Sequence, residues 1–77
     1  MKPGTEKLHM WLVTESPAAV LVCDGGVSKT RELWLPRSLI DYLRITPPPQ
    51  PGPRPSIEFT LPEWKINQAN LWDFVIG

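Results

Sequence analysis

The sequence predicts a mainly β fold, with about five strands forming a small antiparallel curled sheet or open barrel and one short helix beside it. Residues 7–14 place apolar side chains at every second position, which is the period of a β-strand. The segments 32–36 (ELWLP) and 58–62 (EFTLP) are near repeats in which a strand-like run ends at a proline. An Asp-Gly-Gly turn at 24–26 separates two apolar runs, as in a hairpin. Together, these patterns favour short strands joined by tight corners.

The first half of the chain predicts three strands. Residues 1–6 are expected to form a flexible arm ahead of the first strand, 7–14. That strand places three apolar side chains on one face: Leu8, Met10 and Leu12. Residues 18–23 are apolar throughout, which predicts a strand covered on both faces and therefore central. The run 31–35 completes the hairpin and places Trp34 on the face opposite its two leucines.

The middle of the chain turns twice. Pro36 begins a corner, after which residues 39–46 are expected to form a short turn and then a fourth strand. Residues 47–55 contain six prolines, which cannot pair in a sheet and which favour an extended polyproline conformation. This stretch is therefore interpreted as a stiff surface loop within a single domain that spans residues 1–77.

The last third predicts a strand, a helix and a final strand. Residues 56–61 have strand character, and Thr60 with Glu63 forms the Thr-x-x-Glu pattern of a capping box, which predicts a short helix over 62–69. The apolar terminal run 71–76 could add a last strand that closes the sheet, or it could form a homodimer contact.

Composition argues against several function classes. Eight basic residues balance eight acidic ones, which excludes both a basic nucleic-acid coat and an acidic DNA mimic. Cys23 is the only cysteine and His9 the only histidine, so no usual zinc spacing exists and no internal disulfide is possible. No membrane-spanning run is visible. We therefore expect a cytoplasmic protein that has no cofactor, no metal and no catalytic constellation.

Four tryptophans in 77 residues are the most unusual feature of the composition. Some of them could belong to the core and its lid, but tryptophan is also enriched at binding hot spots. Because Trp34 lies on the polar face of its strand between two arginines, the predicted partner-binding residues are Trp34, Arg37, Trp11, Arg31 and Tyr42. An alternative interpretation uses Arg31, Trp34, Arg37, Tyr42 and Arg44 as a stacking platform for single-stranded nucleic acid.

Three strings carry a resemblance to a known group of proteins. They are AVLVCDG at 19–25, LWLPRSLI at 33–40 and FTLPEW at 59–64. They resemble the AxLxxDG, WLPKSxI and TxPEW motifs of small phage and prophage proteins, over roughly residues 18–66. The chain departs from that pattern in its longer proline loop, in Lys65 where the helix usually has an apolar residue, and in its last segment.

The resemblance implies a binder without catalysis, since small phage proteins commonly act on host factors and some such families include anti-CRISPR proteins. The leading hypothesis is a phage-derived inhibitor that docks on a host protein complex, such as a CRISPR effector subunit, and sterically blocks its binding to target DNA. The alternative is a single-stranded nucleic-acid-binding module of phage replication. An enzyme is the least favoured class, because so short a chain rarely builds a catalytic cleft.

Overall fold

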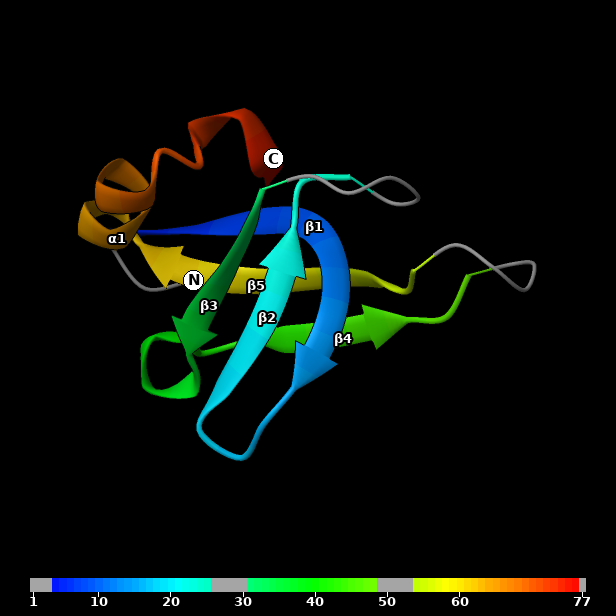
Figure 1. Ribbon diagram of the computed structural model, residues 1–77. Coiled ribbons are helices and arrows are strands. Elements are labelled where there is room, and N and C mark those ends of the chain that lie inside the picture. The colour runs from blue at the N-terminus through cyan, green and yellow to red at the C-terminus, as the bar shows by residue number, and fades with distance from the viewer. Residues whose placement is uncertain (1–3, 26–30, 49–53, 77) are drawn as a thin grey trace.

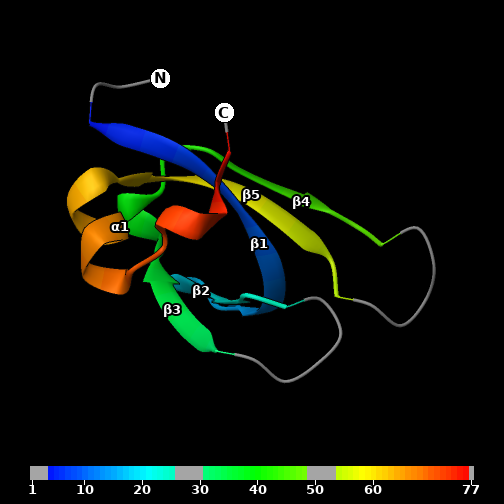
Figure 2. The ribbon, with the colours of Figure 1, turned by 90° about the horizontal axis from the view of Figure 1, so that it is seen from above.

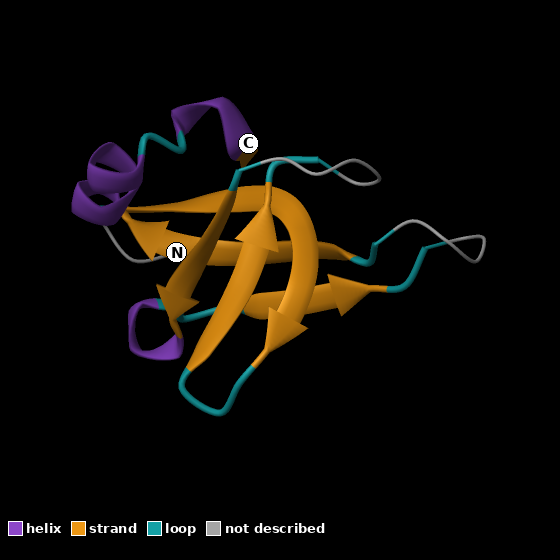
Figure 3. Cartoon of the chain, viewed as in Figure 1, coloured by secondary structure: helices purple, strands orange, loops and turns teal. Residues whose placement is uncertain are grey.

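The computed structural model describes residues 4–25, 31–48 and 54–76, and it confirms the predicted fold class (Figures 1 and 3). Within these residues, six strands form one antiparallel sheet that does not close, and a single short α-helix accompanies them. In chain order the elements are β1 (Thr5–Glu15), β2 (Ala19–Cys23), β3 (Glu32–Pro36), the 3-10 helix η1 (Arg37–Leu39), β4 (Leu43–Thr46), β5 (Ser56–Pro62), α1 (Glu63–Ala69), the 3-10 helix η2 (Trp72–Phe74) and β6 (Val75–Ile76).

The long strand β1 belongs to both halves of the sheet. The strand order is β3-β2-β1-β5-β4, and β6 pairs with β1 outside this path. The first part of β1 pairs with β5 from Thr5↔Pro62 to Trp11↔Ser56, whereas its last part pairs with β2. A register shift between Leu12 and Thr14 marks a β-bulge, which bends a strand and increases its twist. Figure 1 shows β1 curving so that the β2–β3 pair crosses in front of the β4–β5 pair.

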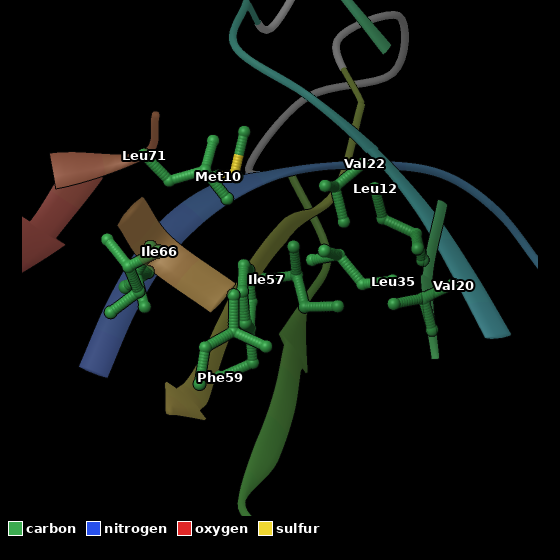
Figure 4. Close-up of a cluster of buried hydrophobic side chains, with 11 residues drawn as sticks. Met10, Leu12, Val20, Val22, Leu35, Ile57, Phe59, Ile66 and Leu71 are labelled. Atoms are coloured by element: carbon green, nitrogen blue, oxygen red, sulfur yellow. The ribbon is translucent and has the colours of Figure 1, made fainter. Parts of the chain in front are cut away.

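The core lies inside this curled sheet and is almost entirely aliphatic. The predicted inward face of the first strand is confirmed, because Leu8, Met10 and Leu12 are all buried. The remaining members of the cluster come from both halves of the sheet and from the last third of the chain: Val20, Val22, Leu35, Ile57, Phe59, Leu61, Ile66 and Leu71 (Figure 4). The prediction that 18–23 forms a central strand is also confirmed, since β2 lies between β1 and β3.

The helix forms where it was expected, but the predicted capping box is wrong. Thr60 is a buried residue of β5, and its Oγ1 accepts hydrogen bonds from the backbone N–H groups of Asp41 and Tyr42. The N-cap position is Pro62, which has no side-chain capping hydrogen bond. The helix ends at Asn70, which adopts the left-handed conformation with φ 57°. This conformation allows the chain to reverse, after which the N–H of Leu71 reaches the carbonyl of Ile66 at 3.0 Å.

Other segments differ from the expectation in extent. β1 begins at Thr5, inside the predicted arm, because the start of the strand pairs with the end of β5. The strand expected after a short turn within 39–46 is β4 at Leu43–Thr46, and only Val75–Ile76 of the terminal run is a strand. Residues 1–3 of the arm, 26–30 of the hairpin loop and 49–53 of the proline-rich loop lie outside the described residues. In Figure 2, the α1–η2 segment lies between the β2–β3 pair and the β4–β5 pair.

Candidate functional site

Three of the four tryptophans are exposed, and the hydrophobic core cluster contains no tryptophan. Trp34, Trp64 and Trp72 retain 50%, 57% and 43% of their accessible area. Large aromatic side chains bury most of their area in folded proteins, and exposed apolar patches mark binding surfaces more often than chance. The position of the exposed tryptophans is therefore the first guide to function.

Trp34 occupies the outer face of β3, as the alternation predicted. Glu32, Trp34 and Pro36 are exposed, whereas Leu35 between them is fully buried. β3 pairs with β2, and Trp34 lies opposite Leu21 in this pair. β3 stands at one end of the strand order and is therefore an edge strand. Trp34 thus stands on an edge strand, where both its side chain and one side of its backbone face outward.

The two arginines predicted to work with Trp34 have structural partners instead. Arg37 donates from Nε to the carbonyl of Ser16 at 3.0 Å and from Nη2 to Glu15 Oε1 at 2.7 Å. Its backbone N–H also donates to the carbonyl of Ala18, so Arg37 fastens η1 to the β1–β2 turn. Arg31 donates from Nη2 to the carbonyl of Asn70 at 3.4 Å. Neither guanidinium is directed toward Trp34 by these bonds.

Trp11 and Tyr42 lie elsewhere, on the outer face of the β1–β5–β4 sector. The Lys7 ammonium stands 4.9 Å from the centre of the Tyr42 ring. The rings of His9 and Trp11 meet edge to face at 5.0 Å.

The register of this sector places residues of opposite charge in one row. His9 is opposite Glu58 on β5, and Glu58 is opposite Arg44 on β4. β3 and β4 stand at opposite ends of the strand order. The register therefore places Trp11, Tyr42 and Arg44 on one sector, whereas Trp34 stands on β3 at the other end of the strand order.

The second exposed aromatic surface was missed by sequence analysis. Trp72 in η2 donates from Nε1 to Asn67 Oδ1 on α1. Trp64 precedes Asn67 by three positions and is therefore its neighbour on the helix surface. We call the group Trp64, Asn67 and Trp72 the cap surface, because Ile66 and Leu71 of the same segment pack into the core.

A signal for the cap surface exists in the sequence. A helix turns by about 100° per residue, so Trp64 and Ile66 point in nearly opposite directions. In a helix of seven residues only one of them can face the core, and the structure buries Ile66. The second aromatic, Trp72, had no such signal, because its exposure depends on how the chain leaves α1.

The thiol of Cys23 makes its contacts inside the fold. The thiol is fully buried and donates to the carbonyl of Gly25 at 2.8 Å. Arg54 donates to Sγ at 3.0 Å, and its Nη1 stands 3.8 Å from Glu32 Oε2. Within residues 4–25, 31–48 and 54–76, no group of three histidine, cysteine or acidic side chains is arranged to hold a metal ion. In the same part of the chain, no helix has the length and apolar character needed to cross a membrane.

Comparison with known proteins adds no assignment. No protein family, no curated protein and no solved structure matches this chain.

Proposed function

We propose that this chain is a non-catalytic binding domain that acts by occupying a partner protein in a stoichiometric complex. The observation that carries the proposal is the exposure of three tryptophans that are not part of the core cluster. Covering the exposed half of an indole removes roughly 100 Å² of apolar area from water, which is worth about 2.5 kcal/mol. This is the magnitude of a binding hot spot.

The cap surface is the first contact that we propose. Trp72 is bonded to Asn67, Trp64 lies three positions before Asn67 on α1, and the segment that carries both tryptophans is fixed by its buried residues Ile66 and Leu71. Anchors that are already held in place lose little conformational entropy when a partner binds. Trp34 forms a separate candidate contact, and the roles of Arg31, Arg37, Trp11 and Tyr42 in partner binding stay predictions.

The specific partner that we propose is a host defence complex, most simply a subunit of a CRISPR effector in the bacterial cytoplasm. Support for this step comes from the resemblance of the motifs at 19–25, 33–40 and 59–64 to small phage proteins. In such a complex the domain would cover the DNA-binding surface of the effector, so inhibition would need one copy per site and no turnover.

The experiment has two stages. A tagged copy is first used to capture partners from a bacterial lysate that contains a CRISPR system, with nuclease present throughout. The captured subunit is then purified and titrated with wild type, Trp64→Ala, Trp72→Ala and the surface control Thr46→Ala, whose parent side chain is exposed on β4.

We expect each tryptophan variant to weaken binding about 30-fold or more, which corresponds to about 2 kcal/mol, and Thr46→Ala to bind as wild type does. Equal binding by all four proteins would remove the cap surface from the proposal. Target DNA bound by the effector should fall in proportion to the domain added, and an unchanged DNA affinity would remove the inhibitor assignment.

A second candidate function is binding of single-stranded nucleic acid. The observation that favours it is the outer face of the β1–β5–β4 sector, where Lys7, His9 and Arg44 stand beside the rings of Trp11 and Tyr42. Stacking on such rings contributes about 1–3 kcal/mol per base. This candidate requires retardation of oligonucleotides that weakens as salt rises and is reduced by Tyr42→Ala. No retardation at low salt would reject it.

A further inference from the structure

The edge of β3 offers backbone groups to another strand. The N–H of Arg37 bonds to the carbonyl of Ala18, and the N–H of Asp24 bonds to the carbonyl of Arg31, at either end of the β2–β3 ladder. Pairs in an antiparallel ladder alternate between bonded and non-bonded, so Leu33 and Leu35 bond to β2. The N–H and C=O groups of Glu32 and Trp34, and the C=O of Pro36, therefore point away from β2.

These outward groups meet no strand in the described part of the chain, because β3 pairs only with β2 there. Proteins protect such edges with short strands, charged side chains, prolines, bulges or a covering segment. In β3 the charge and the proline stand at the two ends, Glu32 and Pro36, and the centre is a tryptophan that is half exposed. The centre of this edge therefore carries neither a charge nor a proline, and no strand pairs with it in the described part of the chain.

We propose that the β3 edge pairs with the β3 edge of a second copy of this chain, antiparallel and about a two-fold axis at Trp34. The sequence of the strand is symmetric about this residue, since Leu33 and Leu35 flank it. An isologous contact needs this kind of self-complementary pattern. Registers displaced from Trp34 would leave part of the five-residue strand without a partner.

This register pairs the outward donors of both copies. The N–H of each Trp34 donates to the C=O of the other Trp34, and the N–H of each Glu32 donates to the C=O of the other Pro36. Pro36 has no N–H, so its position opposite Glu32 leaves no donor unpaired there. The two indoles stand opposite each other on the outer face, and aromatic cross-strand pairs of this kind stabilise a sheet. On the inner face, each Leu33 reaches the other Leu35.

The charges near the edge do not oppose this contact. Arg37 is drawn away from the edge by Glu15 and the carbonyl of Ser16, and Arg31 is drawn toward Asn70. The Glu32 carboxylate stands 3.8 Å from the Arg54 guanidinium of its own chain. In the terminal segment 71–76, the other predicted dimer contact, Val75 and Ile76 pair with β1 of their own chain and Leu71 is buried. β3 is therefore the self-association surface that we propose.

The test is sedimentation equilibrium of the purified full chain from about 1 µM to 1 mM. We expect the mass to rise from 8.7 kDa toward twice that value. Glu32→Pro removes an outward N–H at the first position of the strand, where proline is tolerated, and keeps Trp34. Glu32→Gln is its matched control, because it removes the same charge and keeps the N–H. The proline variant should remain at 8.7 kDa while the glutamine variant still dimerises.

Amide hydrogen exchange supplies a second readout that needs no substitution. Exchange at Glu32 and Trp34 should slow as concentration rises, whereas Leu33 and Leu35 are already protected by β2 and should change little. If Glu32→Pro does not fold, Trp34→Lys places two cations at the axis, and Trp34→Thr is its uncharged control. A wild type that stays monomeric at 1 mM, or a dimer that is indifferent to these variants and unprotected at Trp34, would overturn the proposal.

The measurement separates this inference from the proposed function. It uses the purified chain alone, so its result does not depend on capture of a host protein. A monomer that still binds its partner through the cap surface would reject only the β3 contact.

Discussion

Ile66 and Trp64, two positions apart on α1, should respond to substitution in opposite ways. Ile66 is fully buried in the core cluster, whereas Trp64 keeps 57% of its area. Ile66→Ala deletes three buried carbons and leaves a cavity, which costs about 2–5 kcal/mol. A domain of this size has a total stability of about 4–12 kcal/mol, so this single change removes a large part of it. The expected fall in Tm is at least about 8 °C.

Trp64→Ala should behave differently, because the lost contacts are on the surface and alanine is the better helix former. We expect a change in stability below about 1 kcal/mol. Urea unfolding followed by circular dichroism measures both variants, and an unchanged m-value confirms that the folded and unfolded states are comparable. If Trp64→Ala lowered stability as much as Ile66→Ala, Trp64 would be part of the fold and the cap surface would lose its first anchor.

Three further outcomes test the internal structure. Arg37→Ala should lower stability by about 1 kcal/mol in urea unfolding, since it removes two partly exposed hydrogen bonds, and an unchanged midpoint would contradict the anchoring role of this side chain. Thr60→Val should cost about 1–3 kcal/mol because a buried acceptor for the N–H of Tyr42 is lost, whereas Thr60→Ser should keep most of the stability. Asn70→Gly should raise stability by about 0.5–1 kcal/mol and Asn70→Ala should lower it, because Asn70 has positive φ, and thermal melts that gave the opposite order would contradict this conformation.

Local pattern predicted the strands well because burial in a curled sheet follows the period of two. Leu8, Met10 and Leu12 needed no tertiary information to be placed inside. The two near-repeated pentapeptides show the limit of local pattern. The one at 32–36 became an edge strand followed by a 3-10 turn, whereas the one at 58–62 became an inner strand followed by an α-helix. Neighbouring strands, rather than the pentapeptide, decide between these outcomes.

Partners distant in sequence explain the errors. Thr60 fits a capping box, but its hydroxyl is taken by backbone donors at 41 and 42, which the sheet brings beside it. The partners of Arg37 within the fold, Glu15 at the end of β1 and Ser16 in the following turn, are equally distant in sequence, and its role in partner binding stays a prediction. Exposure of Trp34 was predictable from alternation alone. Exposure of Trp72 was not, because it follows from the left-handed residue at which α1 ends.

The bend in β1 has a consequence for the order in which the domain assembles during synthesis. The last part of β1 can pair with β2 as soon as both have left the ribosome, because a short turn joins them. The first part must wait for β5 and β6, and its pair Lys7↔Ile76 joins segments far apart along the chain. Non-local strand pairing of this kind folds slowly. We therefore expect a nascent β1–β2–β3 meander whose apolar inner face stays uncovered until α1 has been synthesised. During this interval the chain would need a chaperone most.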